Sequence, residues 1–258
     1  MLKALASIGA ATLAFMAATG RIVMFALTAL ATGLSPPFYV RVILRQMLDV
    51  GYFSLPVVGL TAIFTGMVLA LQSYTGFSRF SAESAIATVV VLSVTRELGP
   101  VIAALMVAGR VGAAMAAEIG TMSVTDQIDA LTTLSTEPLR YLVFPRLLAG
   151  LVTLPLLVVV ADIIGVFGGY LVSIYKFGFN PQTYLDRTFQ YLQVSDVVSG
   201  LVKAAVFGFI IALMGCYHGY HSRGGAQGVG QATTYAVVSA SILILVFDYG
   251  ITQALFAR

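Results

Sequence analysis

An arginine and a glutamate stand next to each other inside a long apolar stretch. Twelve uncharged residues separate Arg96 and Glu97 from Glu83 before them, and twelve separate them from Arg110 after them. A charge at the centre of a bilayer costs about 2.5 to 3.5 kcal/mol even on the lenient insertion scales. Neighbouring residues of a helix point about 100° apart, so the two side chains do not simply neutralise each other. At least one is expected to reach another helix, a cavity or a ligand headgroup. An ion pair with another helix and a cargo-lining role are the two hypotheses.

Other polar and aromatic residues could act with this pair. Gly99-Pro100 follows it directly, and proline is expected to loosen the helix there because it removes a backbone hydrogen bond. Asp162 and Asp248 are isolated acids that suit either an ion relay or a buried hydrogen-bonded acid. A presumed outer loop carries aromatics that are read as interface anchors or as lipid contacts. These aromatics are Tyr74, Phe77 and Phe80.

A short amphipathic segment follows the charged stretch. Apolar residues recur at spacings of four, three and three, which predicts a helix of about three turns; they are Val124, Ile128, Leu131 and Leu134. Ser123-x-x-Asp126 is a weak signal for the helix start, and Pro138 is expected to end it. Such a helix would dock on a motor protein or lie on the membrane. Acidic residues disfavour an anionic leaflet and favour the protein partner; they are Glu118, Asp126, Asp129 and Glu137.

Motifs of hydrolytic enzymes are missing from the sequence. A P-loop needs Gly-Lys-Ser/Thr, and none of the three lysines follows a glycine. Neither Gly-x-Ser-x-Gly nor His-Glu-x-x-His occurs. His218 and His221 have no obvious carboxylate or thiolate ligand nearby, and Cys216 reads as a small buried hydrophobe. We predict no catalytic residue, no metal site and no cofactor in this chain, so any ATP and Mg²⁺ would be bound by a partner ATPase.

Composition indicates the solvent and the fold class. The chain of 258 residues is 59% hydrophobic and 10% charged, with a mean hydropathy of +0.96, whereas soluble domains carry about 25% charged residues. Only helical bundles and closed barrels satisfy every backbone group in hydrocarbon. Uncharged runs of 29 residues after Asp49 and 24 after Arg223 exceed the roughly 20 that a membrane helix needs. We therefore predict an all-α membrane protein. The net charge of +3 is too diffuse to suggest nucleic acid.

The chain divides into an N-terminal part, residues 1–50, and a permease-like domain of five spans, residues 51–258. Residues 1–34 read as an uncleaved interfacial helix, with a sixth span as the alternative, and residues 38–50 as an interfacial elbow. Basic residues fall weakly on the inward side, with Lys203 expected at an outward segment or span end. Residues 177–195 are expected to form short helices on the outer face. The expected spans are about 52–76, 84–113, 141–175, 196–219 and 231–256.

Small residues repeat at four-residue spacing in two of these spans. Gly165 and Gly169 form one pair, and Gly112, Ala116 and Gly120 form a series. This spacing lets helix backbones approach closely. The contact is expected either within one subunit or between subunits.

The segments described above also carry a family resemblance. The stretches are Thr95–Val101, Ala108–Gly112, Ala117–Met122, Thr125–Leu131, Glu137–Tyr141, Gly219–Ala226 and Gly228–Gly230. They resemble the MlaE (YrbE) family of ABC-transporter permeases, from about residue 38 onward.

This resemblance implies a homodimeric permease with an interfacial N-terminal helix and five spans per subunit. It implies three protein partners, which are a cytoplasmic ABC ATPase, a STAS-domain protein and a hexameric MCE-domain protein. Its location would be the bacterial inner membrane, as a multi-pass protein. Its cargo would be phospholipid moved between the inner and outer membranes, which maintains outer-membrane lipid asymmetry.

Carried onto this chain, the resemblance places Arg96 and Glu97 beside a lipid cavity with the three aromatics named above. It makes 118–134 the segment that couples to the ATPase, through Glu118, Thr121, Val124, Asp126, Ile128, Asp129 and Leu131. The chain departs from the family pattern at Leu134-Ser135-Thr136-Glu137, where Met, a small residue and Asp or Asn are commoner. This departure leaves the match to a particular ATPase open.

Three other functions compete with phospholipid transport. A related permease would import sterols or other hydrophobic compounds. An ion-coupled secondary carrier would use Glu97, Asp162 and Asp248 as relays. A membrane scaffold would transport nothing.

Overall fold

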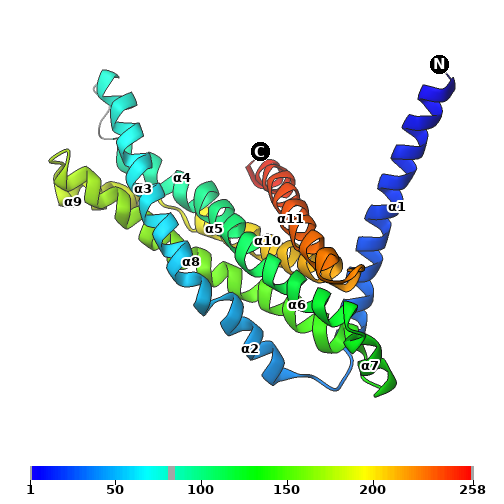
Figure 1. Ribbon diagram of the computed structural model, residues 1–258. Coiled ribbons are helices and arrows are strands. Elements are labelled where there is room, and N and C mark those ends of the chain that lie inside the picture. Colours follow the sequence, from blue (N-terminus) through cyan, green and yellow to red (C-terminus); the bar gives the residue numbers. More distant parts are fainter. Residues whose placement is uncertain (1, 81–84, 257–258) are drawn as a thin grey trace.

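The computed structural model describes residues 2–80 and 85–256 and is built from helices throughout this part of the chain (Figure 1). Six helical segments there are long and apolar enough to cross a membrane, which confirms the predicted all-α membrane protein. They are Gly9–Gly33, Val40–Phe77, Ile86–Val124, Leu139–Tyr175, Val194–Tyr220 and Gly225–Leu255. The first of them falls in residues 1–34, whose interfacial placement stays a prediction.

The helices follow one another with short connections. The N-terminal part holds α1 (Leu2–Gly33), α2 (Val40–Val50) and the 3₁₀ turn η1 (Tyr52–Ser54). The middle of the chain holds α3 (Leu55–Phe77), η2 (Ser78–Phe80), α4 (Ile86–Ser93), η4 (Val94–Leu98), α5 (Gly99–Val107), η5 (Ala108–Gly112), α6 (Ala113–Val124) and α7 (Gln127–Thr133). The remainder holds η6 (Leu139–Val143), α8 (Phe144–Tyr175), α9 (Pro181–Tyr191), α10 (Val194–Tyr220) and α11 (Gly225–Phe256).

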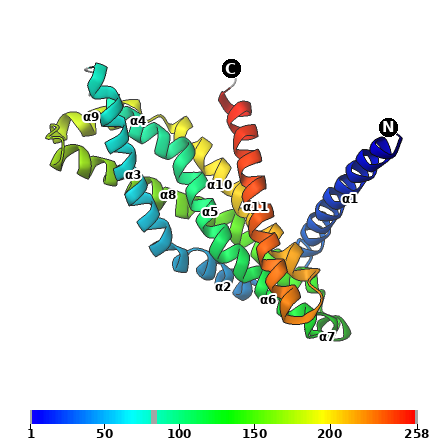
Figure 2. The ribbon, with the colours of Figure 1, turned by 45° about the horizontal axis from the view of Figure 1, so that its top comes forward.

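The short helices α7 and α9 lie at opposite ends of the bundle (Figures 1 and 2). We call these the α7 end and the α9 end. The α9 helix was expected in the outer segment 177–195, and its N-terminus is capped by Asn180, whose side chain accepts from the backbone N–H groups of Gln182 and Thr183. The main apolar core lies between α5, α6, α8 and α10, with Leu147 and Phe207 fully buried.

The expected second span is a single helical run that is longer than predicted. It extends from Ile86 to Val124, eleven residues past the expected end at 113, because no proline occurs between Ala113 and Val124 to stop the helix. Two of its five-residue segments, η4 and η5, are π-helical, and so is η6 before α8. A π-helical turn closes its hydrogen bonds one residue later than an α-helical turn.

Each π-helical segment carries one arginine, and two of these arginines hold the N-terminal part to the bundle. Arg110 of η5 donates to the Ser54 hydroxyl and to the backbone carbonyl of Asp49 at 2.5 Å. Arg140 of η6 donates to the backbone carbonyls of Thr32 and Pro36 at 2.9 and 3.1 Å. The elbow α2, which was expected over 38–50, and the end of α1 are thereby fixed beside α8.

Beyond this attachment, α1 diverges from the other helices (Figure 1). Phe25 packs against Tyr217, Tyr220 and His221 at the end of α10, with ring centroids 5.5 to 5.8 Å apart. The N-terminal half of α1 leaves apolar side chains such as Phe15 exposed. This exposed apolar surface suits a lipid or protein neighbour.

Glycines set the closest helix crossings. A Cβ atom on Gly66 of α3 would overlap the carbonyl oxygen of Gly165 in α8, so the pair Gly165 and Gly169 serves packing within one subunit. The series that includes Gly112 and Ala116 packs on α10 in the same chain, where a Cβ on Gly219 would lie 2.9 Å from the Ala116 carbonyl oxygen. These contacts are of the first expected kind, packing within one subunit.

A reciprocal close crossing joins α8 and α10, and it gives a first prediction. A Cβ on Gly208 would overlap the Gly150 carbonyl, and the reverse also holds. We expect Gly208→Ala to lower the free energy of unfolding by about 1–3 kcal/mol, the usual cost of overpacking. Chemical unfolding in detergent, followed by circular dichroism, measures this. The matched control is Gly230→Ala on α11, where a Cβ meets nothing within 4 Å; equal loss in both variants would contradict the packing role.

The predicted amphipathic helix is shorter than expected and starts elsewhere. Helix α7 has seven residues, and Asp126 at its start has a left-handed φ of 57° and makes no capping hydrogen bond. Ser123 does not cap it either, because its hydroxyl lies within hydrogen-bond distance of the carbonyls of Tyr220 and Ser222. Val124 therefore belongs to α6. The helix ends before Ser135, which has a φ of 56°, so Pro138 begins the next helix instead of ending this one.

Candidate functional site

The charged pair within the apolar span reaches other helices. Arg96 lies in η4, and its guanidinium contacts the Asp196 carboxylate of α10 at 2.6 Å from Nη2 and 2.9 Å from Nε. Asp196 is fully buried, whereas the Arg96 side chain stays 35% exposed. The same carboxylate accepts from the backbone N–H of Gln193 at the start of α10. Arg96 is thus held by a buried partner while part of it remains accessible.

Lys203 of α10 connects the second member of the pair to α11. Its ammonium lies 2.6 Å from Glu97 Oε2 and 3.0 Å from Asp248 Oδ1. It also donates to the backbone carbonyl of Arg96 at 3.0 Å. Thr252, one helical turn after Asp248, donates to Glu97 Oε1 at 3.2 Å. We call Arg96, Glu97, Asp196, Lys203 and Asp248 the charged network.

Regular helix spacing positions this network. Asp196 and Lys203 are seven residues apart, so they lie two turns apart on one face of α10. Arg96 and Glu97 are adjacent, and each meets a different residue of that face. This confirms the expectation that the pair does not neutralise itself. The ion-pair hypothesis holds for both residues within one chain.

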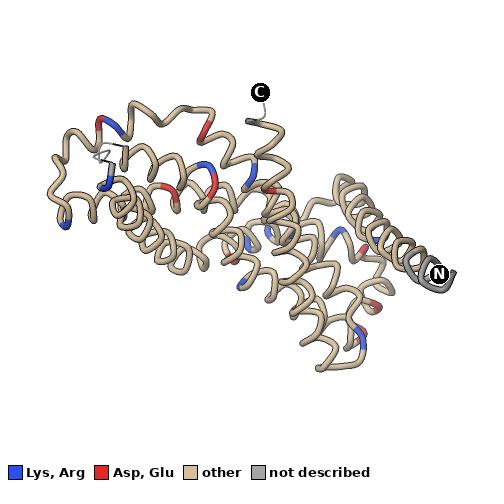
Figure 3. The backbone as a smooth tube through the Cα atoms, turned by 90° about the horizontal axis from the view of Figure 1, so that it is seen from above, with Lys and Arg blue, Asp and Glu red and all other residues tan. Residues whose placement is uncertain are grey.

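The network contains two cations and three carboxylates, which gives a formal charge of −1. Lys203 is the largest fully buried side chain among the described residues. Figure 3 shows acidic and basic residues side by side in the interior of the bundle, away from its ends. Charges in such surroundings are stable only when they are paired and hydrogen-bonded, so the three helices are held in one arrangement by their shared charges.

Two of the network's residues were missed by sequence reasoning. Asp196 was not considered, and Lys203 was expected at an outward segment or span end, whereas it is fully buried inside α10. The sequence does carry a signal for both: Asp196 and Lys203 are an acid and a base seven residues apart within one apolar span. Asp248 was recognised as an isolated acid, and the structure supplies Lys203 as its partner.

Of the predicted aromatic residues, Tyr74 and Phe77 do not join the charged network within this chain. Tyr74 stacks on Phe177, with ring centroids 3.8 Å apart, and Phe77 packs against a smaller apolar cluster with Val90 and Val94. The side chain of Phe80 lies outside the described residues. A groove of about 420 Å³ lies between α3 and η4; it is lined by Phe64, Thr65, Val68, Leu69, Gln72 and Leu98.

The predicted coupling residues gather at the α7 end. Glu118 bonds to the buried Arg146 of α8 at 2.8 Å, and Thr121 donates to a carbonyl of its own helix. In α7, Ile128 is buried and Leu131 packs on the core, while Asp126 and Asp129 face outward. The amphipathic orientation is as predicted, except that Leu134 is 74% exposed because the helix ends before it.

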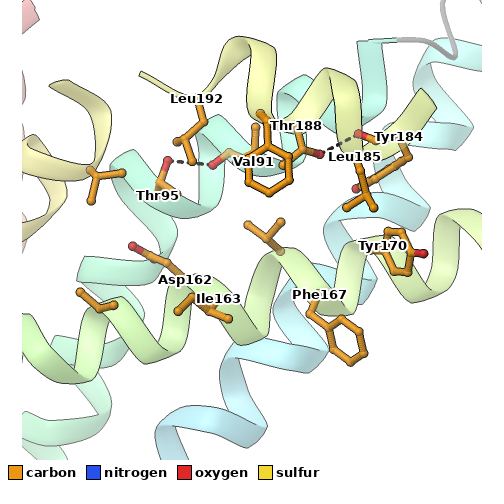
Figure 4. Close-up of a pocket in the computed structure, with 14 residues that line it drawn as sticks. Val91, Thr95, Asp162, Ile163, Phe167, Tyr170, Tyr184, Leu185, Thr188 and Leu192 are labelled. Atoms are coloured by element: carbon orange, nitrogen blue, oxygen red, sulfur yellow. Dashed lines mark hydrogen bonds between the residues drawn. The ribbon is translucent and has the colours of Figure 1, made fainter. Parts of the chain in front are cut away.

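Asp162 lies apart from the charged network. It lines a cavity of about 510 Å³ between α4, η4, α8, α9 and α10, whose walls are almost entirely apolar (Figure 4). Among the described residues, no group of three or more His, Cys, Asp or Glu side chains is placed to hold a metal ion.

Comparison with known proteins decides the family. The family model described as permease MlaE matches residues 43–254. The chain belongs to the MlaE permease family. It is therefore the non-catalytic membrane subunit of an ABC transporter, and it works with a separate ATPase.

Relatives extend this comparison across organisms. A probable ABC transporter permease of Rickettsia bellii is 61% identical over 97% of this chain and 96% of its own length. The MlaE permease protein of the intermembrane phospholipid transport system of Haemophilus influenzae is 37% identical over 83% and 82%. The chloroplastic protein TRIGALACTOSYLDIACYLGLYCEROL 1 of Arabidopsis thaliana is 38% identical over 83% of this chain and 61% of its own length.

Proposed function

We propose that this MlaE-family permease moves phospholipids between the inner and outer membranes of a bacterial envelope and so maintains outer-membrane lipid asymmetry. The observation that carries the proposal is the charged network, in which Arg96 is anchored by Asp196 and remains 35% exposed. A partly exposed arginine side chain at membrane depth suits the phosphate of a lipid headgroup, which arginine binds through paired hydrogen bonds. The phospholipid transport named for the Haemophilus influenzae relative supports the same cargo.

The groove between α3 and η4 supplies a place for the acyl chains. Leu98, which follows Glu97, forms one wall, and Phe64 and Val68 of α3 form the other. Apolar side chains on α3 and α11 are exposed in the single chain, including Leu60, Phe64, Ile242 and Val246. We infer a homodimer in which a second copy covers part of these faces and encloses the groove.

The partner ATPase would act on the permease at the α7 end. ATP hydrolysis by the partner ATPase would move α7, and Glu118–Arg146 would pass this motion to α8. The assembly would also include a STAS-domain protein and a hexameric MCE-domain protein, with the chain in the inner membrane. ATP and Mg²⁺ would bind to the ATPase and not to this chain.

The ion-coupled alternative has less support from the arrangement of its acids. Glu97 and Asp248 share Lys203, but Asp162 lines a separate cavity and forms no ion pair or hydrogen bond with either acid. A relay through all three acids has no continuous polar path among the described residues. Sterol or other hydrophobic cargo remains the main competitor of phospholipid.

Arg96→Ala is the variant that tests the cargo. We expect ATP-driven transfer of a fluorescent phospholipid, measured with the complete complex in proteoliposomes, to fall by about tenfold or more, because a charge-assisted hydrogen bond contributes about 1.5–3 kcal/mol. Glu97→Ala is expected to impair transfer similarly. Arg79→Ala, at an exposed position outside the network, is the control.

Size-exclusion chromatography establishes that each variant still assembles with the ATPase. Wild-type transfer by an assembled Arg96→Ala complex would refute the headgroup role. Transfer of a sterol in place of phospholipid by the wild-type complex would favour the competing cargo.

A further inference from the structure

The cavity around Asp162 is separate from the charged network and differs from it in chemistry. Thr95 and Val197 lie on its wall, whereas their chain neighbours Arg96 and Asp196 point to the network. The cavity therefore lies on a different face of η4 from the network. Its volume of about 510 Å³ falls within the range of roughly 300–1,000 Å³ that is usual for small-molecule sites.

Its walls suit a hydrocarbon body. The lining of Val91, Val159, Ile163, Val166, Phe167 and Leu192 is apolar. Ile163 is 66% exposed and Phe167 is 51% exposed on α8, so the cavity opens sideways beside exposed apolar side chains of this helix. Tyr170 and Tyr184 meet edge to face at the α9 side, with ring centroids 5.7 Å apart, and close that side (Figure 4).

Asp162 introduces one unsatisfied polar group into this site. It is nine-tenths buried, and its Oδ1 has no hydrogen-bond partner. In Figure 4 it extends from α8 toward Thr95. Gly99 makes room for it, because a Cβ there would overlap Oδ1. Oδ1 is packed against Gly99 and is closed to the cavity, but the carboxyl group of Asp162 lines the cavity wall. Burying a carboxyl group costs free energy, so a ligand that hydrogen-bonds to this group from within the cavity is favoured.

The other hydroxyl groups of the wall narrow the ligand chemistry. The Thr95 hydroxyl donates to the carbonyl of Val91, and the Thr188 hydroxyl donates to that of Tyr184, so both protons are already used. Burial raises the pKa of the Tyr184 phenol, which keeps it neutral. No cationic side chain lines the cavity, and a phosphate headgroup would lack a counter-charge there. A hydroxyl group suits Asp162 in either protonation state, because it both donates and accepts.

We propose that this cavity binds a neutral membrane lipid that carries one free hydroxyl group, with the hydroxyl on Asp162 and the hydrocarbon body between α8, α9 and α4. Such a molecule enters from the bilayer past Ile163 and Phe167. The site is independent of the phospholipid path proposed above.

Photolabelling of the full-length protein in phosphatidylcholine nanodiscs tests the proposal. The probe is a long-chain alcohol with a diazirine in its chain, and labelled peptides are mapped by mass spectrometry. We expect the label on residues 159–170. Unlabelled hexadecan-1-ol is expected to compete about tenfold better than its methyl ether, which lacks the donor.

Three variants separate the parts of the site. Asp162→Leu is expected to abolish the preference for alcohol over ether, and Asp162→Asn, which keeps a donor and an acceptor, to retain it. Ile163→Trp is expected to block labelling at the mouth. Its control is Leu156→Trp, which is equally exposed on the same helix but outside the cavity.

Equal competition by alcohol and ether in the wild-type protein would overturn the proposal and would indicate an ordinary acyl chain as the occupant. Labelling that persists in a folded Ile163→Trp variant would overturn it as well. Because neither measurement uses ATP or lipid transfer, failure here leaves the proposed transport function standing, and the reverse also holds.

Discussion

Lys203→Met is expected to lower the free energy of unfolding by about 3 kcal/mol and to abolish lipid transfer. Removing one partner of a buried ion pair usually costs about 3–5 kcal/mol, because a charge is left without compensation. Lys203 serves Glu97 and Asp248 at once. The lower end of that range applies because the two acid side chains are 39% and 21% exposed in the single chain. Chemical unfolding in detergent measures the loss.

A neutralised network distinguishes lost pairing from lost packing. In Lys203→Met combined with Glu97→Gln and Asp248→Asn, no unpaired charge of this group remains, so stability is expected to recover while transfer stays absent. The variant Lys203→Arg keeps the charge and should retain most of the stability. A Lys203→Met protein as stable as the wild type would show that the shared ammonium does not hold the three helices together.

Asp129→Lys is expected to weaken binding of the partner ATPase by about tenfold or more. Asp129 is exposed on α7 while Ile128 anchors that helix to the core, so the substitution changes the outward face without disturbing the fold. Reversing a charge at an electrostatically complementary interface places like charges opposite each other. This costs several kcal/mol of binding free energy. Titration of the ATPase onto the permease in nanodiscs measures the dissociation constant.

The control for this experiment is Asp186→Lys. Asp186 is an exposed acid on α9, at the opposite end of the bundle, so the same change of net charge should leave ATPase binding unaltered. Equal weakening by both variants would indicate a general charge effect. Unchanged binding by both would remove Asp129 from the docking surface.

Much of the fold followed from hydropathy, because long uncharged runs have few stable alternatives in lipid. The elbow and five spans were predicted close to their observed bounds. The second span was predicted too short, since hydropathy falls near Arg110 although the helix continues to Val124. Arg110 is tolerated within the helix because η1 supplies the Ser54 hydroxyl and α2 supplies the Asp49 carbonyl to receive it.

The site was only partly predictable, for reasons of geometry. The position of Arg96 and Glu97 within an apolar run identified them as buried charges, but the sequence around them does not show which helix faces them. Each of the three π-helical segments shifts by one residue the side chains that face a neighbouring helix. Periodicity analysis assumes a constant helical period and therefore misses these shifts. The start of α7 was misplaced for a different reason: Asp126 adopts a left-handed conformation, and Ser123 bonds to the end of α10.

Arg140 contacts main-chain oxygens of Thr32 and Pro36, and Arg110 contacts that of Asp49. Every residue type offers the same carbonyl, so the amino acids at 32, 36 and 49 can change without weakening these attachments. Inserting or deleting a single residue between 32 and 49 would instead carry the oxygens out of reach. The residue types at these three positions are therefore free to vary over evolution, whereas the number of residues between them is fixed.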